Sequence, residues 1–191
     1  MARSVLLIVT CLASLWATCA AAGPLPEQAE AVLKTGKPWV SVSQSGEAAM
    51  ILAAIEIDAP PRTVWAAMLD CARVRKMIAN LTVCRIIDSG PGWDVREQVT
   101  AGTLFVPTLR SLYRSDYMPF SRIVFRRTGG DLKIMQGEWR LEPRNGGRST
   151  RVIYENRLAA HVLAPASVVR AGLRADCGKV LINLRRVALA G

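Results

Sequence analysis

The sequence contains a single histidine, His161, among 191 residues. A histidine-rich metal site is therefore excluded, and the five cysteines lack the paired spacing of zinc ligands. The chain also lacks a G-x-S-x-G elbow, a P-loop and a G-x-G-x-x-G turn. His161 has no identifiable nucleophile as a partner, so we interpret it as a loop or rim residue rather than a base. We expect no metal and no cofactor.

Acidic residues are also scarce, with 15 Asp and Glu against 25 Lys and Arg, for a net charge of +10. Such a surplus favours anionic partners, namely lipid head groups, nucleic acid or acidic ligands. No internal repeat, low-complexity tract or interdomain linker is visible, so the length suits one domain. The sequence carries no signal for an oligomeric state.

The first residues form a basic start at Met1-Ala2-Arg3, an apolar run and a small-residue end at Ala20-Ala21-Ala22. This order is typical of a secretory signal peptide over residues 1–22. The alternative is an uncleaved membrane anchor, because the 18 residues from Val5 to Ala22 carry no charge. We favour cleavage and export, to a bacterial periplasm, which makes nucleic acid the least suitable partner.

Residues 23–47 are expected to form an N-terminal extension with a short amphipathic helix from Pro26 to Thr35. One domain then occupies residues 48–191. It begins with an alternating strand over residues 50–57, which Pro60-Pro61 terminates.

Two short helices are predicted next, over residues 61–72 and 74–79, because proline is tolerated in the first turn of a helix. In the first of them Trp65, Met68 and Leu69 share one face. Six strands follow, over residues 81–88, 93–101, 110–117, 121–127, 134–142 and 150–158.

A long helix is predicted from residue 165 or 166 onward, because apolar residues recur at intervals of three and four. The hairpin signal Asn145-Gly146 marks the last turn, and residues 101–109 form an interruption that carries Phe105. The expected fold is α+β, with a curved antiparallel sheet of about seven strands. The long helix is the element able to cover its concave face.

This order of elements resembles the helix-grip fold of the START-like (SRPBCC) superfamily, and most of all its polyketide cyclase/dehydrase and coenzyme Q-binding branch. The resemblance covers residues 48–188. It is carried by the segments IDAPPRTVWAAMLD (57–70), VREQV (95–99), RIVFRRTGGDLKIMQGEWRLEP (122–143) and TRVIYENRL (150–158). It implies a cavity between the sheet and the long helix that holds a hydrophobic or amphipathic small molecule.

On this reading the first helix closes one end of the cavity, central strands form its floor and the last helix its roof. Methionines suit a pocket that adapts to its ligand, and a few polar groups are usual in such a site. The alternative is an ordinary packed core. Gly137 shares the predicted inward face, so a leucine there should fill the cavity. The predicted ligand-binding residues are Trp65, Met68, Met77, Phe105, Met135, Trp139, Tyr154, Asn156, Leu173, Cys177 and Val180.

Three cysteines remain after the leader, and an oxidising compartment favours a bridge between Cys71 and Cys84. Two buried free thiols are the alternative. Cys177 is left over, as a core residue of the last helix.

Arginines crowd the middle strands. Some are expected to pair with glutamates across the sheet, and exposed pairs contribute little stability. The excess could dock the domain on an anionic membrane, although a general basic surface without a specific role fits equally well. The arginines are Arg110, Arg114, Arg122, Arg126, Arg127, Arg140, Arg144, Arg148, Arg151 and Arg157.

The leading functional hypothesis is an exported binding protein for a lipid, quinone or polycyclic molecule, rather than an enzyme. The alternative is a cyclase or dehydratase that uses the same cavity, with Glu97, Arg110, Tyr113 and Tyr154 as candidates to polarise a carbonyl. A protein-interaction domain without a ligand is the third possibility.

Overall fold

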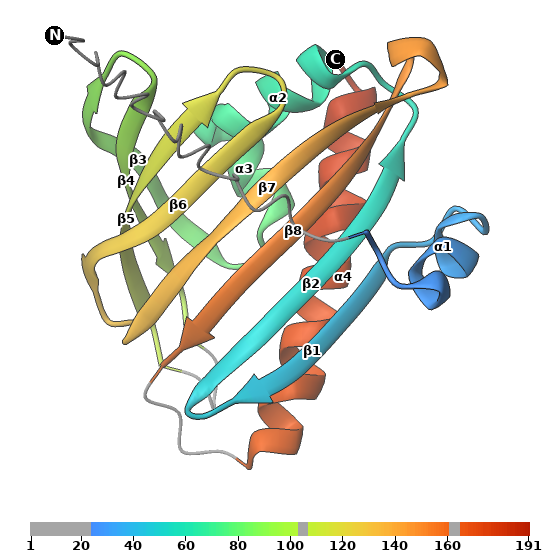
Figure 1. The fold of residues 1–191 in the computed structure, drawn as a ribbon. Coiled ribbons are helices and arrows are strands. Elements are labelled where there is room, and N and C mark those ends of the chain that lie inside the picture. Colours follow the sequence, from blue (N-terminus) through green and yellow to red (C-terminus); the bar gives the residue numbers. More distant parts are fainter. Residues whose placement is uncertain (1–23, 103–106, 161–164) are drawn as a thin grey trace, which may run out of the picture.

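A computed structural model describes residues 24–102, 107–160 and 165–191. These residues form one antiparallel sheet of eight strands in the order β1-β2-β8-β7-β6-β5-β4-β3 (Figure 1). Consecutive strands from β3 to β8 are neighbours, whereas β2 pairs with β8. The strands are β1 Trp39–Ser45, β2 Ala48–Ile57, β3 Leu81–Gly90, β4 Trp93–Thr100, β5 Leu109–Met118, β6 Arg122–Gly130, β7 Ile134–Arg144 and β8 Ser149–Ala159.

The sheet contains one strand more than the sequence predicted. Strand β1 lies within the segment expected as an N-terminal extension, and it pairs with β2 from Trp39 opposite Ala54 to Ser45 opposite Ala48. The alternation of apolar and polar residues in β1 is weak because serines stand between its valines. Val42 is the only buried residue of this strand. A strand at the edge of a sheet buries little, so its hydrophobic signal is weak.

The two short helices are α2, Pro61–Leu69, and α3, Cys71–Met77. The break between them falls at Asp70, earlier than predicted. The Asp70 carboxylate accepts hydrogen bonds from the backbone N–H groups of Ala72, at 2.7 Å, and Arg73, at 3.4 Å. It therefore caps α3 at its N-terminus, and an aspartate at this position is a strong start signal.

The long helix α4, Ala166–Leu189, packs against the concave side of the sheet, and α2 and α3 lie at one end of the same side (Figure 1). The core between them is built from apolar residues of β2, β8 and α4, including Ile55, Val152 and Leu181, all fully buried. The first helix, α1 Glu27–Leu33, instead contacts the outer face, where Leu33 packs on Ala54. No helix in the described part of the chain is long and apolar enough to cross a membrane.

Gly137 occupies a position where the backbones of β7 and β8 approach closely. An added Cβ would stand 2.0 Å from the Glu155 carbonyl oxygen and 2.8 Å from the Asn156 Cα. The prediction that a leucine here would fill the cavity is therefore wrong, because the side chain would collide with the backbone of the neighbouring strand. Glycine in a strand often marks such a close approach.

Candidate binding cavity

A cavity of about 140 Å³ lies between the concave face of the sheet and the three helices α2, α3 and α4. Its walls are mainly apolar and aromatic, with a few polar side chains from β4 and β5. The lining residues are Met68, Leu69, Val74, Met77, Ile78, Arg96, Gln98, Tyr113, Ser115, Tyr117, Ile123, Phe125, Met135, Trp139, Tyr154, Val180 and Leu184.

Stacked aromatic rings form the floor of this cavity. The rings of Trp139 and Tyr154 stack with centroids 4.1 Å apart, and the rings of Phe125 and Tyr154 stack with centroids 6.1 Å apart. Tyr113 meets Phe125 edge to face at 6.3 Å. Because these residues come from four adjacent strands, the alternation of side chains places one ring per strand on the same face. The result is an aromatic floor of stacked and edge-to-face rings, which an apolar ligand can contact.

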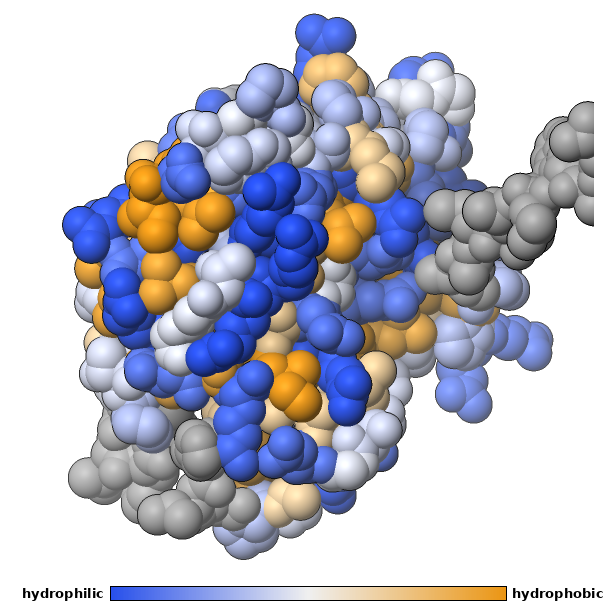
Figure 2. All heavy atoms as spheres, turned by 60° about the vertical axis from the view of Figure 1, so that its left-hand side comes forward, coloured by the Kyte–Doolittle hydropathy of each residue, from blue (hydrophilic) through white to orange (hydrophobic). Residues whose placement is uncertain are grey.

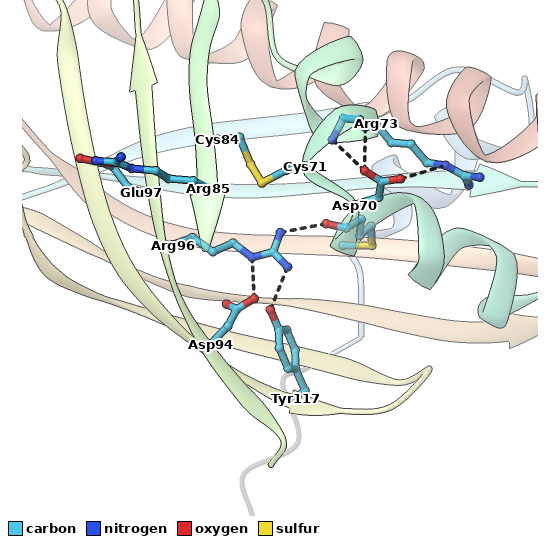
Figure 3. The surroundings of a disulfide bond; sticks show 11 residues. Asp70, Cys71, Arg73, Cys84, Arg85, Asp94, Arg96, Glu97 and Tyr117 are labelled. Carbon is cyan, nitrogen blue, oxygen red and sulfur yellow. Dashed lines mark hydrogen bonds and ion pairs between the residues drawn. A yellow bond between two sulfur atoms is a disulfide. The ribbon is translucent and has the colours of Figure 1, made fainter. Parts of the chain in front are cut away.

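A buried ion pair stands at the β4 end of the cavity (Figure 3). Arg96 and Asp94 are each only 4% exposed, and the Arg96 Nε donates to Asp94 Oδ2 at 2.8 Å. A second nitrogen of Arg96 donates to the Tyr117 hydroxyl at 3.1 Å. Sequence reasoning missed this pair, although the two residues alternate in phase with Gln98 along β4. A charge that faces a core is costly unless it is paired.

The polar groups at this end keep their protons. Burial disfavours the charged form of Arg96, but Tyr117, Tyr113 and Asp94 outweigh it and raise the pKa of the guanidinium. Burial raises the pKa of Tyr113 to about 12, and it raises the pKa of Tyr117 as well. At neutral pH the cavity therefore offers a cation and neutral hydroxyls, which are donors for a ligand oxygen.

Six of the predicted ligand-binding residues line the cavity, and four others belong to the packed core around it. The roof lies closer to the C-terminus of α4 than predicted, at Val180 and Leu184. The remaining predicted ligand-binding residue, Phe105, lies outside the described residues, and so does His161, which was interpreted as a loop or rim residue. Those that line the cavity are Met68, Met77, Met135, Trp139, Tyr154 and Val180, and those outside its lining are Trp65, Asn156, Leu173 and Cys177.

Trp65 is buried beneath the cavity wall rather than in it. Its ring meets Tyr117 at 5.8 Å and Phe120 at 6.0 Å, both edge to face. Asn156 is also buried, and its amide nitrogen donates to the Tyr154 hydroxyl at 2.8 Å. Both residues thus hold aromatic rings of the wall in place.

The candidate catalytic residues are split between the two faces of the sheet. Glu97 and Arg110 lie on the outer face, where the Arg110 Nε is 2.6 Å from Glu97 Oε1 and Arg85 binds the same carboxylate. Tyr113 and Tyr154 line the cavity. No carboxylate is found among the described lining residues, so the four candidates do not form one site.

The disulfide predicted from the sequence is present between Cys71, at the start of α3, and Cys84 in β3 (Figure 3). It ties the helix pair that covers the cavity to the edge of the sheet. Cys177 is free and buried in α4, where burial raises the pKa of its thiol to about 12.

These thiols give a direct prediction. Alkylation of the unfolded but unreduced protein should modify Cys177 and leave Cys71 and Cys84 unmodified, as mass spectrometry of tryptic peptides would report. Reduction should then cost about 3 kcal/mol of stability, the value for a loop of this length. Three modified cysteines from this part of the chain without a reductant would contradict the bridge.

The arginines of the outer sheet face are largely matched by acids. Asp116, for example, accepts from Arg114 at 2.9 Å and from Arg126 at 3.0 Å. Figure 2 shows this side, with hydrophilic residues over most of the surface and smaller apolar patches between them. Other pairs are Arg122–Glu138, Arg140 with Glu138 and Glu155, Arg144–Glu142, and Arg151 with Glu30 and Glu56.

A comparison of the sequence with family models supports this fold and its cavity. Residues 57–185 match the model described as polyketide cyclase/dehydrase and lipid transport. The chain belongs to this family. The match confirms the START-like resemblance and includes every residue that lines the cavity.

Solved structures of family-like proteins share the fold at low identity. The protein TTHA0849 from Thermus thermophilus is 17% identical, with a TM-score of 0.63 over 74% of this chain and 97% of that one. The human StarD13 (DLC2) lipid transfer and protein localization domain is 13% identical, with a TM-score of 0.63 over 84% and 93%.

The Zhui aromatase/cyclase from Streptomyces sp. R1128 is 15% identical, with a TM-score of 0.59 over 75% and 92%. No curated protein sequence matches the chain. The family and the fold together make this protein a helix-grip domain that binds hydrophobic small molecules or lipids.

Proposed function

We propose that this protein is a carrier for a hydrophobic small molecule with a polar, oxygen-bearing end. The observation that carries the proposal is the placement of Arg96 at one end of an aromatic cavity. A planar or short aliphatic group would lie on the rings of Trp139 and Tyr154. Its carbonyl or carboxylate would accept from Arg96, whose guanidinium has five N–H groups, not all of them used by Asp94, Tyr117 and the Met68 carbonyl.

The size of the cavity restricts the ligand. An engineered cavity of about 150 Å³ holds benzene, whereas sites for larger ligands span about 300–1,000 Å³. At about 140 Å³ the present cavity has room for one ring. A quinone head or a similar single ring fits without movement, and a polycycle or lipid requires the methionines of the wall to repack or α4 to separate from the sheet.

A second candidate function is a cyclase or dehydratase of the kind named by the family. Arg96 and Tyr117 favour it, because a cation and a hydroxyl together polarise a carbonyl.

Native mass spectrometry after incubation with a lipid extract separates the candidate functions. A carrier retains an unchanged ligand and an enzyme releases an altered one. A domain that retains no ligand but holds a protein partner would support an interaction module instead.

The cavity can be tested by filling it from the roof. Val180→Phe adds a ring inside the cavity and should weaken binding of benzoate, a single ring with a carboxylate, at least about tenfold. Because the added ring enters empty space, the free energy of unfolding should change by less than about 1 kcal/mol, below the usual cost of overpacking. Calorimetry and urea denaturation measure the two quantities.

The matched control is Ala175→Phe, which adds the same ring to the exposed side of the same helix. It should leave benzoate binding unchanged. Strong destabilisation by Val180→Phe, together with no benzoate binding by the unaltered protein, would indicate a packed core and refute the carrier.

We also propose that the protein is exported, as the leader over residues 1–22 and the disulfide suggest. N-terminal sequencing of the protein purified from the source cell should begin at or near Gly23. A product that starts at Met1 and sediments with membranes would favour the anchor instead.

A further inference from the structure

Among the described residues, most of the cations without an acidic partner lie on the helices rather than on the sheet. Together α3 and α4 carry eight Lys and Arg residues and only two acids, counting the capping Asp70 with α3. Each acid is near one cation of its own helix, with Asp70 3.7 Å from Arg73 and Asp176 3.8 Å from Lys179. The other cations are Arg75, Lys76, Arg170, Arg174, Arg185 and Arg186.

An apolar stripe runs along the outer side of α4. Val168, Ile182 and Leu189 are 59%, 44% and 54% exposed, unusually high for large apolar side chains on a helix that also roofs a cavity. Their spacings of 14 and 7 residues are close to whole numbers of turns at 3.6 residues per turn, so they share one side. Ala171 and Ala175 are exposed on that side too.

Cations flank Ile182 and Leu189 on both sides, and Arg186 lies in line with Val168. At 100° per residue, Lys179 and Arg186 fall toward α3, and Arg174 and Arg185 fall toward β1. The Arg185 guanidinium donates to the carbonyl of Gly36, which precedes β1, at 2.7 Å. This hydrogen bond shows that the Arg185 side of α4 faces β1.

Helix α3 adds basic residues to the same surface. The Asn183 amide donates to the Met77 carbonyl at 3.0 Å and so holds the two helices together. A hollow between them is lined by Arg73, Lys76 and Arg186, among others.

We propose that this face, the helical basic face, docks the protein on an anionic lipid bilayer, with α4 lying in the plane of the interface. An apolar stripe between rows of Lys and Arg is the pattern of helices that lie on membranes, where the apolar side enters the head-group region and the cations meet lipid phosphates. Nucleic acid would use the cations but leave the stripe exposed. A second copy of the chain would bring two faces of the same charge together.

Docking of this kind would place the cavity against the bilayer. The inner side of α4 carries Val180 and Leu184, which roof the cavity, while its outer side carries the stripe. A ligand that leaves past α4 would then enter lipid rather than water.

Co-sedimentation with vesicles tests the proposal, using the purified protein with its N-terminus sequenced so that any retained leader is known. The protein should bind vesicles of phosphatidylcholine mixed with phosphatidylglycerol and not vesicles of phosphatidylcholine alone. Each basic residue at an anionic surface contributes roughly a fivefold factor. Lys179→Gln with Arg186→Gln should therefore lower the partition coefficient about 30-fold.

The matched control removes two positive charges outside α3 and α4, with Arg148→Gln in the turn before β8 and Arg157→Gln in β8. Its effect on binding should be much smaller. A second variant, Ile182→Ser with Leu189→Ser, should reduce the binding that persists at high salt. Circular dichroism confirms that each variant is folded.

Several results would overturn the proposal. Equal losses from the two charge variants would mean that only net charge matters. Full binding by the serine variant would exclude insertion of the stripe. Equally tight binding to RNA, lost in the same charge variant, would indicate a general polyanion surface, and a dimer dissolved by the serine variant would indicate self-association.

Discussion

Gly137→Ala should destabilise the protein by about 3 kcal/mol or more, at the upper end of the range for overpacked sites. A single added methyl group is normally a small change in a strand. Here its carbon would lie 2.0 Å from a carbonyl oxygen of β8, and backbone cannot rotate aside as a side chain can. Relief requires β7 and β8 to separate at the middle of the sheet, where Gly137 pairs with Asn156. Urea denaturation followed by tryptophan fluorescence would measure the loss.

Gly172→Ala is the matched control for this substitution. Gly172 lies in α4, and no atom stands within 4 Å of the position that its Cβ would occupy. Alanine there should stabilise the protein by about 0.5–1 kcal/mol, because glycine is a poor helix former. The structure therefore predicts that the two substitutions change the free energy of unfolding in opposite directions. If Gly137→Ala were as stable as the unaltered protein, the close approach of the two strands would be wrong.

Gly137 also shows where sequence reasoning stops. Alternation along β7 correctly placed Met135 and Trp139 toward the cavity, because side chains of a strand point to alternate faces. It treated Gly137 as a third such position with an empty place beside it. The distance between two backbones depends on local twist and pleat, and the order of residues does not encode that distance.

The elements were predicted with better success where burial is strong. Residues 50–57 and the long helix were found because apolar residues recur along one face, and the six later strands were found because turn signals such as Asn145-Gly146 separate them. Strand β1 was missed because an edge strand with serines buries only Val42. The cavity roof shifted along α4 because the phase of an apolar repeat identifies the inner side of a helix but not which turn of that side meets a ligand.

The buried ion pair of Asp94 and Arg96 was the most important feature that the sequence analysis did not predict. Its signal was present in the sequence, since Asp94, Arg96 and Gln98 alternate with Val95 and Glu97 along one strand. Nothing in that alternation says which face is buried when both faces carry charged residues. Glu97 was taken as a candidate for chemistry, and it lies on the outer face of the sheet, buried between Arg85 and Arg110. Arg96 lies inside, and only the curvature of the sheet distinguishes the two.

Arg96→Met should therefore cost about 3–5 kcal/mol, the range for breaking a buried ion pair by removing one partner. Asp94 would remain 4% exposed with no cation beside it. The other oxygen of Asp94 has no hydrogen-bond partner among the described residues, so the substitution would leave a buried carboxylate without its cation. The free energy of unfolding in urea is the measurement.

The double variant Arg96→Met with Asp94→Leu separates stability from binding. Replacing both members of a buried pair by apolar residues is often neutral or stabilising, so most of the lost stability should return.

Binding of a ligand that carries an oxygen should not return with the stability. Benzoate, whose carboxylate would meet Arg96, should bind at least about tenfold more weakly than to the unaltered protein, while toluene, with the same ring and no oxygen, should bind equally well. Calorimetry with the two probes measures this difference directly. If benzoate bound to the double variant as it binds to the unaltered protein, Arg96 would serve only the fold, because a ligand oxygen that contacts the guanidinium must lose that contact when the guanidinium is gone.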